Sequence, residues 1–292
     1  MERDRRGDTG PESRPLLQTL VQHGRRVLPR GWAPLVQLAA RALPGLQRYR
    51  ASLIDGDHLY LDLRQSMCLG YFFYGCLPHE AGTARLIRRV ATEGGVVVDV
   101  GANVGYFTRI ASRAVGSTGV VHAVEPLASA LRLLRLNTQD LPNVFIHATA
   151  LSARSGEASL YVHEGGDLST LSPSDDAREV VRVPLTTLDE LLADASRVDL
   201  IKIDVEGHEF EVVMGAMRTL QKFRPVVYFE LLQGYSSRSG YGFDEFRTLL
   251  EPHGYSLAWI DHKDKNTRLL SDLPSTYVVA VPQSRRAELG RD

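Results

Sequence analysis

The chain has 292 residues, of which 43% are hydrophobic and 24% are charged, and its formal net charge is −1. These proportions are typical of a globular protein, and the balanced charge of the whole chain gives no case for binding nucleic acid or a membrane. No apolar run approaches the ~20 residues that span a bilayer, and the first fifteen residues lack the apolar core of a signal peptide. Cys68 and Cys76 have no zinc-site spacing and form no disulfide framework. We therefore expect a cytoplasmic protein with one large α/β domain and an appendage.

The first 50 residues differ in charge from the rest of the chain. They contain ten arginines and four acidic residues, whereas residues 51–292 carry a net charge of −7. Residues 1–15 are polar and are predicted to be disordered. Residues 16–50 alternate leucine with arginine between prolines, which predicts a basic extension of two or three amphipathic helices. These helices could dock on an acidic membrane surface, or pack their leucines on the main domain or across a homodimer. We favour packing, because a helix that packs on another protein surface needs the same apolar stripe as a helix that binds a membrane.

Residues 51–63, ASLIDGDHLYLDL, predict a hairpin around Asp55-Gly56, because apolar residues alternate after this turn signal. The segment from 71 to 90 begins with aromatic residues and ends as an amphipathic helix. His79 and Glu80 precede that helix, where an acidic residue is also an ordinary feature of a first turn.

Residues 96–107, VVVDVGANVGYF, predict a buried strand, a glycine turn and the start of a helix. The β-branched run suits a parallel strand, and Gly101 and Gly105 bracket the turn. The helix N-terminus would point its backbone N–H groups at a ligand in the turn. About two dozen residues later a second strand, VVHAV, ends at Glu125. The pattern predicts a pocket for a nucleoside-bearing cofactor, with a turn that binds no ligand as the plainer alternative.

The turn lacks two of the three glycines that a nicotinamide dinucleotide site requires, because Asn103 and Tyr106 stand in their places. Asp99 at the end of the strand would repel a pyrophosphate and suits a positive group, such as the sulfonium of S-adenosylmethionine. Glu125 suits the ribose hydroxyls, since a carboxylate accepts two hydrogen bonds from a diol. These residues favour S-adenosylmethionine over NAD.

VVVDVGANVGYF, HAVEP and LIKIDVEGHEFEVVMGA together resemble the FkbM family of S-adenosylmethionine-dependent methyltransferases, over residues 51–282. The resemblance implies a Rossmann-like class I methyltransferase sheet with helices on both faces, a reversed final hairpin, and O-methylation of sugars, lipids or polyketides. It also implies that residues 51–92 form a hairpin and a lid helix, with a pocket role for His79 and Glu80, and that residues 93–283 form the catalytic domain. It assigns Asp99, Gly101, Asn103 and Gly105 to the methionine portion of the cofactor. It assigns Glu125 to the ribose and Ala150 to the adenine.

Residues 157–163 and 179–185 predict an inserted β-hairpin, with a polar loop between the two strands that could cover a pocket. Ser169 and Thr170 in this loop could contact a substrate, although loop polarity alone accounts for them. Thr187 is a predicted helix N-cap, with Glu190 three residues later. Residues 284–292 are charged, and we expect them to be frayed.

Residues 198–211, VDLIKIDVEGHEFE, predict a short buried strand that ends at Asp204 and leads into a helix with Met214 on its buried face. Ligands lie beyond the carboxyl ends of such strands. Three interpretations stay open: a general base that accepts the proton of an acceptor hydroxyl, a divalent cation held by carboxylates, and a structural network of Lys202 and Glu209. Glu230 ends the next strand on the same face. The candidate catalytic residues are Asp204, Glu206, His208 and Glu230.

The sequence predicts an S-adenosylmethionine-dependent O-methyltransferase that acts on a hydroxyl of a small molecule, glycan or lipid. We assign no metal ligands and expect no nucleic-acid partner, while a homodimer and peripheral membrane contact through residues 16–50 stay open. The alternatives are a Rossmann-type oxidoreductase that uses NAD and a methyltransferase-like module that binds without turnover.

Overall fold

The computed structural model describes residues 16–27, 32–77, 80–163, 169–231, 240–260, 269–270 and 276–289. The chain divides into unit 1, residues 1–76, and unit 2, residues 77–292. The division falls inside the predicted segment 51–92, so its hairpin belongs to unit 1 and its amphipathic helix to unit 2. The predictions for residues 1–15, for His79 and for the last three residues lie outside the described residues.

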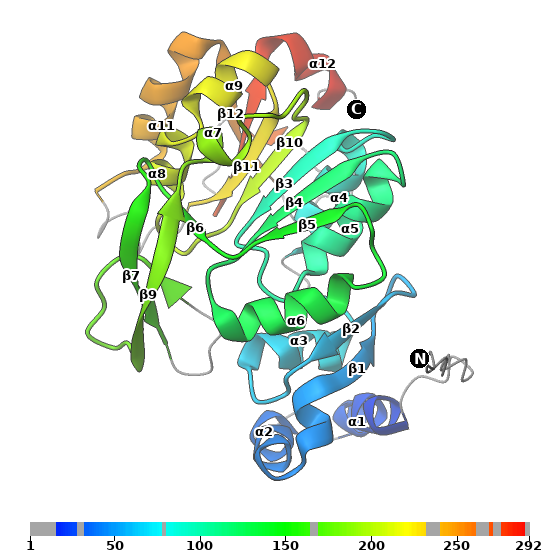
Figure 1. Cartoon of the computed structure of the whole chain (residues 1–292). Coiled ribbons are helices and arrows are strands. Elements are labelled where there is room, and N and C mark those ends of the chain that lie inside the picture. Colours follow the sequence, from blue (N-terminus) through cyan, green and yellow to red (C-terminus); the bar gives the residue numbers. More distant parts are fainter. Residues whose placement is uncertain are drawn as a thin grey trace, which may run out of the picture. The chain divides into compact units, whose positions relative to one another are not determined.

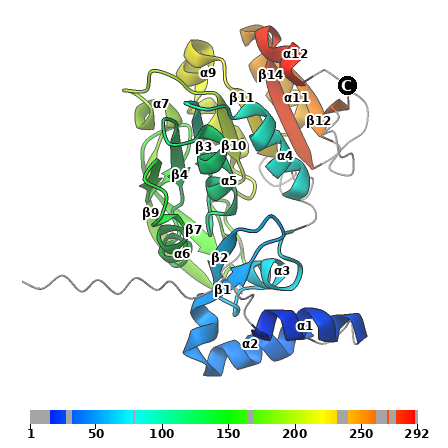
Figure 2. The same ribbon diagram turned by 90° about the vertical axis from the view of Figure 1, so that its right-hand side faces the viewer.

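Unit 1 is a helical extension built around one hairpin, as predicted for residues 51–63. Strands β1 and β2 pair antiparallel, with Tyr49 opposite Leu61, and the Asp55-Gly56 turn lies between them. Figure 2 shows α1 against α3 within this unit. The elements are α1 (Leu16–Val27), α2 (Trp32–Ala42), η1 (Pro44–Arg48), β1 (Tyr49–Ser52), β2 (His58–Leu61) and α3 (Ser66–Tyr74).

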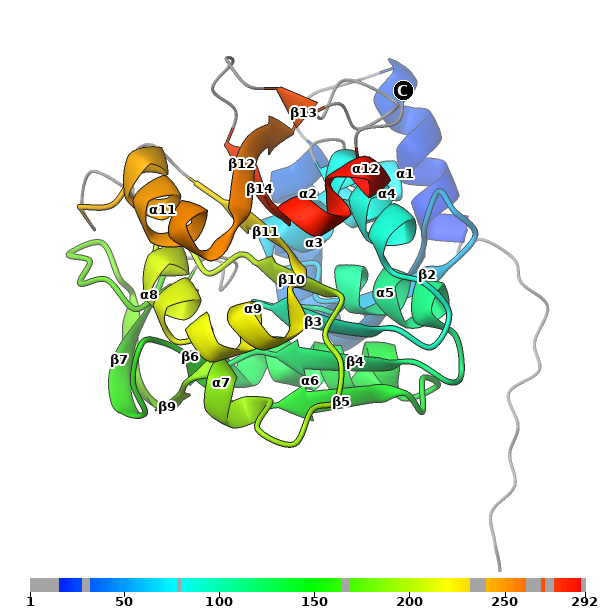
Figure 3. The same cartoon turned by 90° about the horizontal axis from the view of Figure 1, so that it is seen from above.

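Unit 2 contains a sheet in the order β13-β12-β14-β11-β10-β3-β4-β5, which Figure 3 shows from above. Strand β14 is antiparallel to both β11 and β12, and the pairs from β11 to β5 are parallel. The predicted Rossmann-like sheet with a reversed final hairpin is therefore confirmed. Its strands are β3 (Val96–Val100), β4 (Val120–Val124), β5 (Val144–His147), β10 (Leu200–Ile203), β11 (Val226–Glu230), β12 (Tyr255–Ile260), β13 (Leu269–Leu270) and β14 (Tyr277–Pro282).

Helices cover both faces of this sheet, with α4 and α5 on one side in Figure 1 and α7, α8, α9 and α11 on the other. On the second side, strand residues such as Ile201 and Phe229 pack with Val213 and Phe246 in one buried cluster. The helices are α4 (Ala81–Val90), α5 (Tyr106–Val115), α6 (Ala128–Thr138), α7 (Leu188–Leu191), α8 (Glu209–Met214), α9 (Met217–Phe223), α11 (Phe243–Leu250), η3 (Glu251–His253), η4 (Gln283–Arg285) and α12 (Arg286–Leu289).

The inserted hairpin is present as a second sheet in the order β6-β9-β7-β8. Strands β7 and β9 pair antiparallel over their whole length, as Figure 1 shows, and β6 adds to β9 in parallel. The next helix, α7, begins with the predicted capping box of Thr187 and Glu190. The strands are β6 (Ala150–Leu151), β7 (Gly156–Val162), β8 (Ser169–Thr170) and β9 (Glu179–Thr186).

Two sequence predictions about the C-terminal half are wrong. The helix after Asp204 breaks at Gly215 into α8 and α9, so Met214 is 45% exposed instead of buried. Residues 284–289 are helical instead of frayed, because Arg285 pairs with Glu288 and donates a hydrogen bond to the carbonyl oxygen of Asp199. Among the described residues, no helix has the length and hydropathy that a membrane crossing requires.

The turn after β3 lies wedged between neighbouring strand ends. The backbone N–H groups of Gly101 and Ala102 both donate to the carbonyl oxygen of Val124 at the end of β4. Gly101 has a φ of +72°, and a Cβ added there would lie 1.8 Å from the carbonyl oxygen of Asp204. Glycine is required here for its left-handed backbone and for this close approach to the end of β10.

We predict that Gly101→Ala destabilises the protein far more than a left-handed backbone alone explains. The matched control is Gly240→Ala, because Gly240 has a φ of +79° with nothing within 4 Å of an added Cβ. The control should lose about 1–2 kcal/mol of unfolding free energy from backbone strain. Gly101→Ala should lose at least about 2 kcal/mol more, because the backbone at Asp204 must move. Urea unfolding measures both, and equal losses would show that the contact is unimportant.

Candidate active site

The predicted acidic site residues lie at the carboxyl ends of β3, β4, β10 and β11. Lys202 on β10 lies between Asp99 on β3 and Tyr228 on β11 in the sheet register. Asp204 follows β10, and Glu230 is the last residue of β11. Because parallel strands end at one edge of a sheet, the four strands bring residues 99, 125, 204 and 230 to the same edge.

The Lys202 side chain is 2% exposed and binds three groups at once. Its Nζ lies 3.1 Å from Asp99 Oδ1 and 3.5 Å from Asp204 Oδ2, and it donates a hydrogen bond of 3.0 Å to the carbonyl oxygen of Gly101. Burial alone would lower the pKa of this ammonium, but the charges of Asp99 and Asp204 outweigh it and raise the pKa above its ordinary value. Lys202 therefore stays charged and ties the glycine turn to the loop after β10.

Asp99 is 1% exposed, and protein groups occupy its carboxylate. Oδ2 accepts a hydrogen bond of 2.6 Å from the hydroxyl of Thr108 on α5, while Oδ1 faces Lys202 without the angle of a hydrogen bond. Asp99 thus binds Lys202 and the beginning of α5. The contact with a cofactor that the family resemblance implies stays a prediction.

Glu125 joins the glycine turn to the loop after β4. Its Oε2 accepts from the backbone N–H of Asn103 and its Oε1 from that of Leu127, both at 2.9 Å. Burial raises the pKa of Glu125 to about 7, although these two hydrogen bonds oppose the rise. Asn103 has a φ of +48°, a left-handed backbone that asparagine tolerates well. Ala150 is buried against Leu127 in a small apolar cluster.

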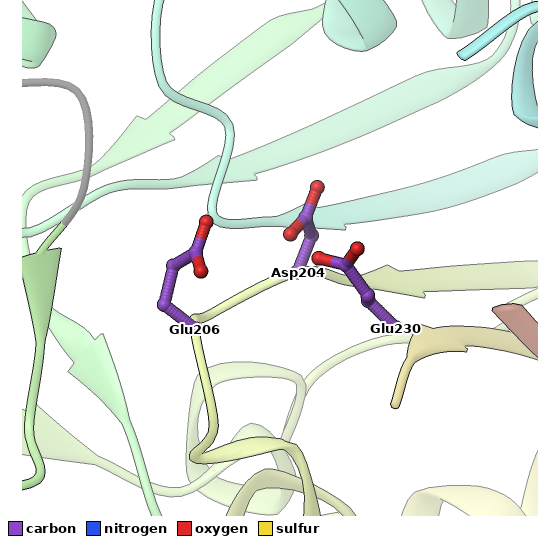
Figure 4. Close-up of side chains that lie close together, drawn as sticks. All are labelled: Asp204, Glu206 and Glu230. Carbon is purple, nitrogen blue, oxygen red and sulfur yellow. The ribbon is translucent and has the colours of Figure 1, made fainter. Parts of the chain in front are cut away.

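Asp204, Glu206 and Glu230 form the acidic group of the site. Their carboxylate oxygens lie within 4.8 Å of one another. In Figure 4, Glu230 and Asp204 point toward each other, and Glu206 projects from the loop after β10. Burial and the charge of Asp204 raise the pKa of Glu206 to about 8, and the same causes raise that of Glu230 to about 9. Glu230 also hydrogen-bonds Asp204, so one of these carboxyl groups carries a proton near neutral pH.

Sequence reasoning missed two tyrosines that support Glu230. Tyr277 lies opposite Glu230 in the pairing of β14 with β11, and its hydroxyl hydrogen-bonds the Glu230 carboxyl group. The Tyr228 ring stacks on Tyr277 at 5.8 Å, and its hydroxyl lies 2.5 Å from that of Thr83 on α4. Tyr277 stands in the strand TYVVAVP and Tyr228 in the strand PVVYFELL, and neither belongs to a site motif. Only the antiparallel register of these strands shows that Tyr277 lies against Glu230.

His208 and Glu209 make their hydrogen bonds to groups outside the acidic group, although the charge of Glu209 acts on Glu206 and Glu230. His208 Nε2 lies 3.0 Å from the hydroxyl of Ser152, and Nδ1 lies 3.6 Å from Glu211. Glu209 Oε1 accepts from the backbone N–H groups of Val205 and Gly207, which is the structural role that the sequence left open. Thr170 on β8 donates a hydrogen bond to the carbonyl oxygen of Glu206, so the inserted sheet contacts the loop after β10. That this sheet covers a pocket stays a prediction.

The acidic group can perform two kinds of chemistry. Asp204, 30% exposed in its side chain, can accept a proton from a hydroxyl held beside it. The three carboxylates can also ligate a divalent cation, because hard cations prefer carboxylate oxygens. A cavity of about 500 Å³ lies elsewhere, at the amino ends of β3 and β10, where Arg197, Asp199 and Arg285 line it. That cavity is remote from these carboxyl groups along the strands.

Comparison with known proteins gives a family model and a curated relative. The model of the Methyltransferase FkbM domain matches residues 99–257. The hexuronic acid methyltransferase AglP of Haloferax volcanii is 29% identical over 154 residues, which cover 52% of this chain and 62% of that protein. The chain therefore spans less than two thirds of this curated relative.

Two solved structures resemble the fold. The FkbM methyltransferase of Methylobacillus flagellatus KT superposes with a TM-score of 0.44 at 18% identity, over 65% of this chain and 44% of that chain. Fibrillarin of Aeropyrum pernix, solved with bound S-adenosyl-L-methionine, gives a TM-score of 0.42 at 14% identity, over 70% and 76% of the two chains.

The raised pKa of Glu230 predicts a pH-dependent stability. A carboxyl group whose folded pKa of about 9 exceeds the ordinary 4.5 contributes stability that is complete below pH 4.5 and lost as the pH rises through 9. Glu230→Gln mimics the protonated form, so it should gain stability relative to the wild type as the pH rises from 5 to 9. Urea unfolding across this range measures the difference. Glu157→Gln, at an exposed acid, should run parallel to the wild type. A constant difference for Glu230→Gln would refute the raised pKa.

Proposed function

Because the chain belongs to the FkbM methyltransferase family, which matches residues 99–257, we propose that it transfers a methyl group from S-adenosylmethionine to a hydroxyl oxygen. The observation that carries the proposal is that one buried lysine, Lys202, joins the glycine turn to Asp204. The predicted cofactor turn and the predicted acceptor site are thereby neighbours at one sheet edge. A methyl transfer needs its two reactants held next to each other in this way.

The turn residues support S-adenosylmethionine as the methyl donor. Asn103 and Tyr106 stand where a dinucleotide site needs glycine, so the turn offers less room for a pyrophosphate. Glu125 lies against the turn through the Asn103 N–H group, and each of its oxygens keeps one lone pair for a ribose hydroxyl. S-Adenosylmethionine supplies an electrophilic methyl group on a positively charged sulfur, which suits this acidic edge.

Asp204 is the residue that we assign to the acceptor. An acceptor oxygen forms the new C–O bond while the C–S bond breaks and its electron pair stays on sulfur; the hydroxyl proton passes to the Asp204 carboxylate. The Lys202 ammonium lies 3.5 Å from Asp204 Oδ2 and holds this carboxyl group beside the glycine turn. Glu230 holds the proton that the pair shares, oriented by the Tyr277 hydroxyl, and leaves Asp204 as the base.

A sugar hydroxyl is the acceptor class that we favour. The Haloferax relative is a hexuronic acid methyltransferase, and polyols offer the hydroxyls that a row of carboxylates can orient by hydrogen bonds. A small-molecule or lipid-linked hydroxyl fits the same chemistry. The cytoplasmic location stays a prediction, and a homodimer stays open.

The cofactor assignment predicts selective binding. Isothermal titration calorimetry should detect binding of S-adenosylmethionine and no binding of NAD. Glu125→Ala should weaken S-adenosylmethionine binding roughly tenfold or more, because the ribose hydroxyls and the backbone N–H of Asn103 lose their hydrogen-bond acceptor. Glu93→Ala, at the opposite end of β3, is the control and should bind like the wild type. Binding of NAD alone would overturn the assignment, and an unchanged affinity in Glu125→Ala would remove Glu125 from the ribose role.

The acceptor assignment predicts which side chain limits turnover. With a radiolabelled methyl donor and a panel of sugars, Asp204→Asn should lower kcat roughly 10²–10⁴-fold, the usual size of a lost general base. Its affinity for the donor should stay within about threefold. His208→Gln should keep most activity, since His208 contacts Ser152 and Glu211 instead. Treatment with EDTA should leave activity intact. Equal losses in both variants, or inactivation by EDTA, would contradict the general-base role of Asp204.

A further inference from the structure

Four leucines of unit 1 point away from its packed interior. On α1, Leu16 and Leu20 are 80% and 67% exposed, and on α2, Leu35 and Leu38 are 62% and 65% exposed. Figures 1 and 2 show both helices at the same end of unit 1. Isolated exposed leucines are common, but pairs spaced three or four residues apart form a stripe on each helix. We call these four residues the leucine face.

Hydrogen bonds fix the opposite side of α1 against the hairpin and α3. The Gln18 side chain is buried, donates to the carbonyl oxygens of Ser52 and Phe72, and accepts from the Ser52 N–H. Val21 is buried on the same side of the helix. Since Gln18 pins the rotation of α1 about its axis, Leu16 and Leu20 cannot turn inward without breaking these bonds.

The inner side of α2 is occupied in the same way. Val36 and Ala40 are buried, and Gln37 donates to the Arg64 carbonyl oxygen and the Ser66 hydroxyl. Within unit 1, α1 and α2 thus pack through residues other than these leucines. The leucine face remains available for a partner outside unit 1.

The charge of this segment favours an anionic partner. Residues 16–50 contain six arginines and no aspartate, glutamate or lysine, a formal charge of +6. Arg41, in the last turn of α2, and Arg50, on β1, are exposed. A symmetric dimer through the leucine face would bring two such segments together with no acid to neutralise them. Residues 77–292 contain 23 basic and 28 acidic residues, so the excess of positive charge lies in the first 76 residues.

We propose that the leucine face of α1 and α2 docks the protein on an anionic lipid bilayer, with the leucines in the headgroup boundary and the arginines on the lipid phosphates. With 12 and 11 residues, α1 and α2 are too short to span a bilayer, and they lie in its plane. Apolar insertion and attraction to anionic lipid act together in such helices, so each contribution has its own test.

The test is vesicle co-sedimentation of the full chain. The wild type should bind mixed phosphatidylcholine–phosphatidylglycerol vesicles, should bind pure phosphatidylcholine vesicles weakly, and should dissociate as salt screens the arginines. Replacing all four leucines of the face by glutamine should lower the partition coefficient roughly tenfold or more. The control variant carries glutamine at three exposed apolar positions of unit 2, Phe145, Val180 and Met214, and should bind like the wild type. The double variant Arg41→Gln, Arg50→Gln should bind anionic vesicles more weakly than the wild type. Its binding should also depend less on salt concentration.

Three results would overturn the proposal. The first is a wild type that does not bind anionic vesicles, and the second is a leucine variant that binds as well as the wild type. The third is a leucine variant that still binds vesicles but no longer forms a dimer in light scattering, or in which unit 2 melts at a lower temperature. Circular dichroism of each variant verifies that unit 1 keeps its helices.

Discussion

The buried ammonium of Lys202 is the interaction on which the site depends. It is 2% exposed, and it contacts Asp99, Asp204 and the carbonyl oxygen of Gly101. A buried cation is costly unless its partners are well placed, and here the parallel register of β3 and β10 sets Lys202 directly beside Asp99. Gly101 completes the arrangement, because a Cβ there would strike the Asp204 backbone. Lys202 thus fixes the position of the glycine turn, the proposed cofactor site, relative to Asp204, and its side chain needs to touch neither proposed reactant.

The carboxyl groups at this edge divide into two kinds. Asp99, Glu125 and Glu209 bind backbone or buried protein groups and shape the three loops that meet at the edge. Asp204, Glu206 and Glu230 face one another, and burial with mutual repulsion raises the pKa of Glu206 and Glu230. Such crowding costs folding free energy at high pH, and perturbed carboxyl groups of this kind gather at functional sites. The structural interpretation of the acidic motif therefore holds for Glu209, and the general-base role of Asp204 stays a proposal.

The sequence predicted the elements better than the directions of their side chains. The β-branched run before Asp99 and the strand before Asp204 were recognisable because strand ends and glycine turns leave local signals. The pairing of His208 with Ser152, across 56 positions, and that of Tyr277 with Glu230 depend on tertiary register and leave no such signal. The C-terminal helix was missed for the same reason, since Arg285 finds its acceptor at Asp199, 86 positions away.

Lys202→Met, measured by urea unfolding at pH 7, tests the central role of the buried ammonium most directly. Without the cation, Asp99 is left as an uncompensated buried charge, and the loss should reach about 3–5 kcal/mol. Adding Asp99→Asn removes that charge and keeps an acceptor for Thr108, so the double variant should recover part of the loss. The double variant also keeps the test decisive if the single variant does not fold. Wild-type stability in Lys202→Met, or no recovery in the double variant, would contradict the account.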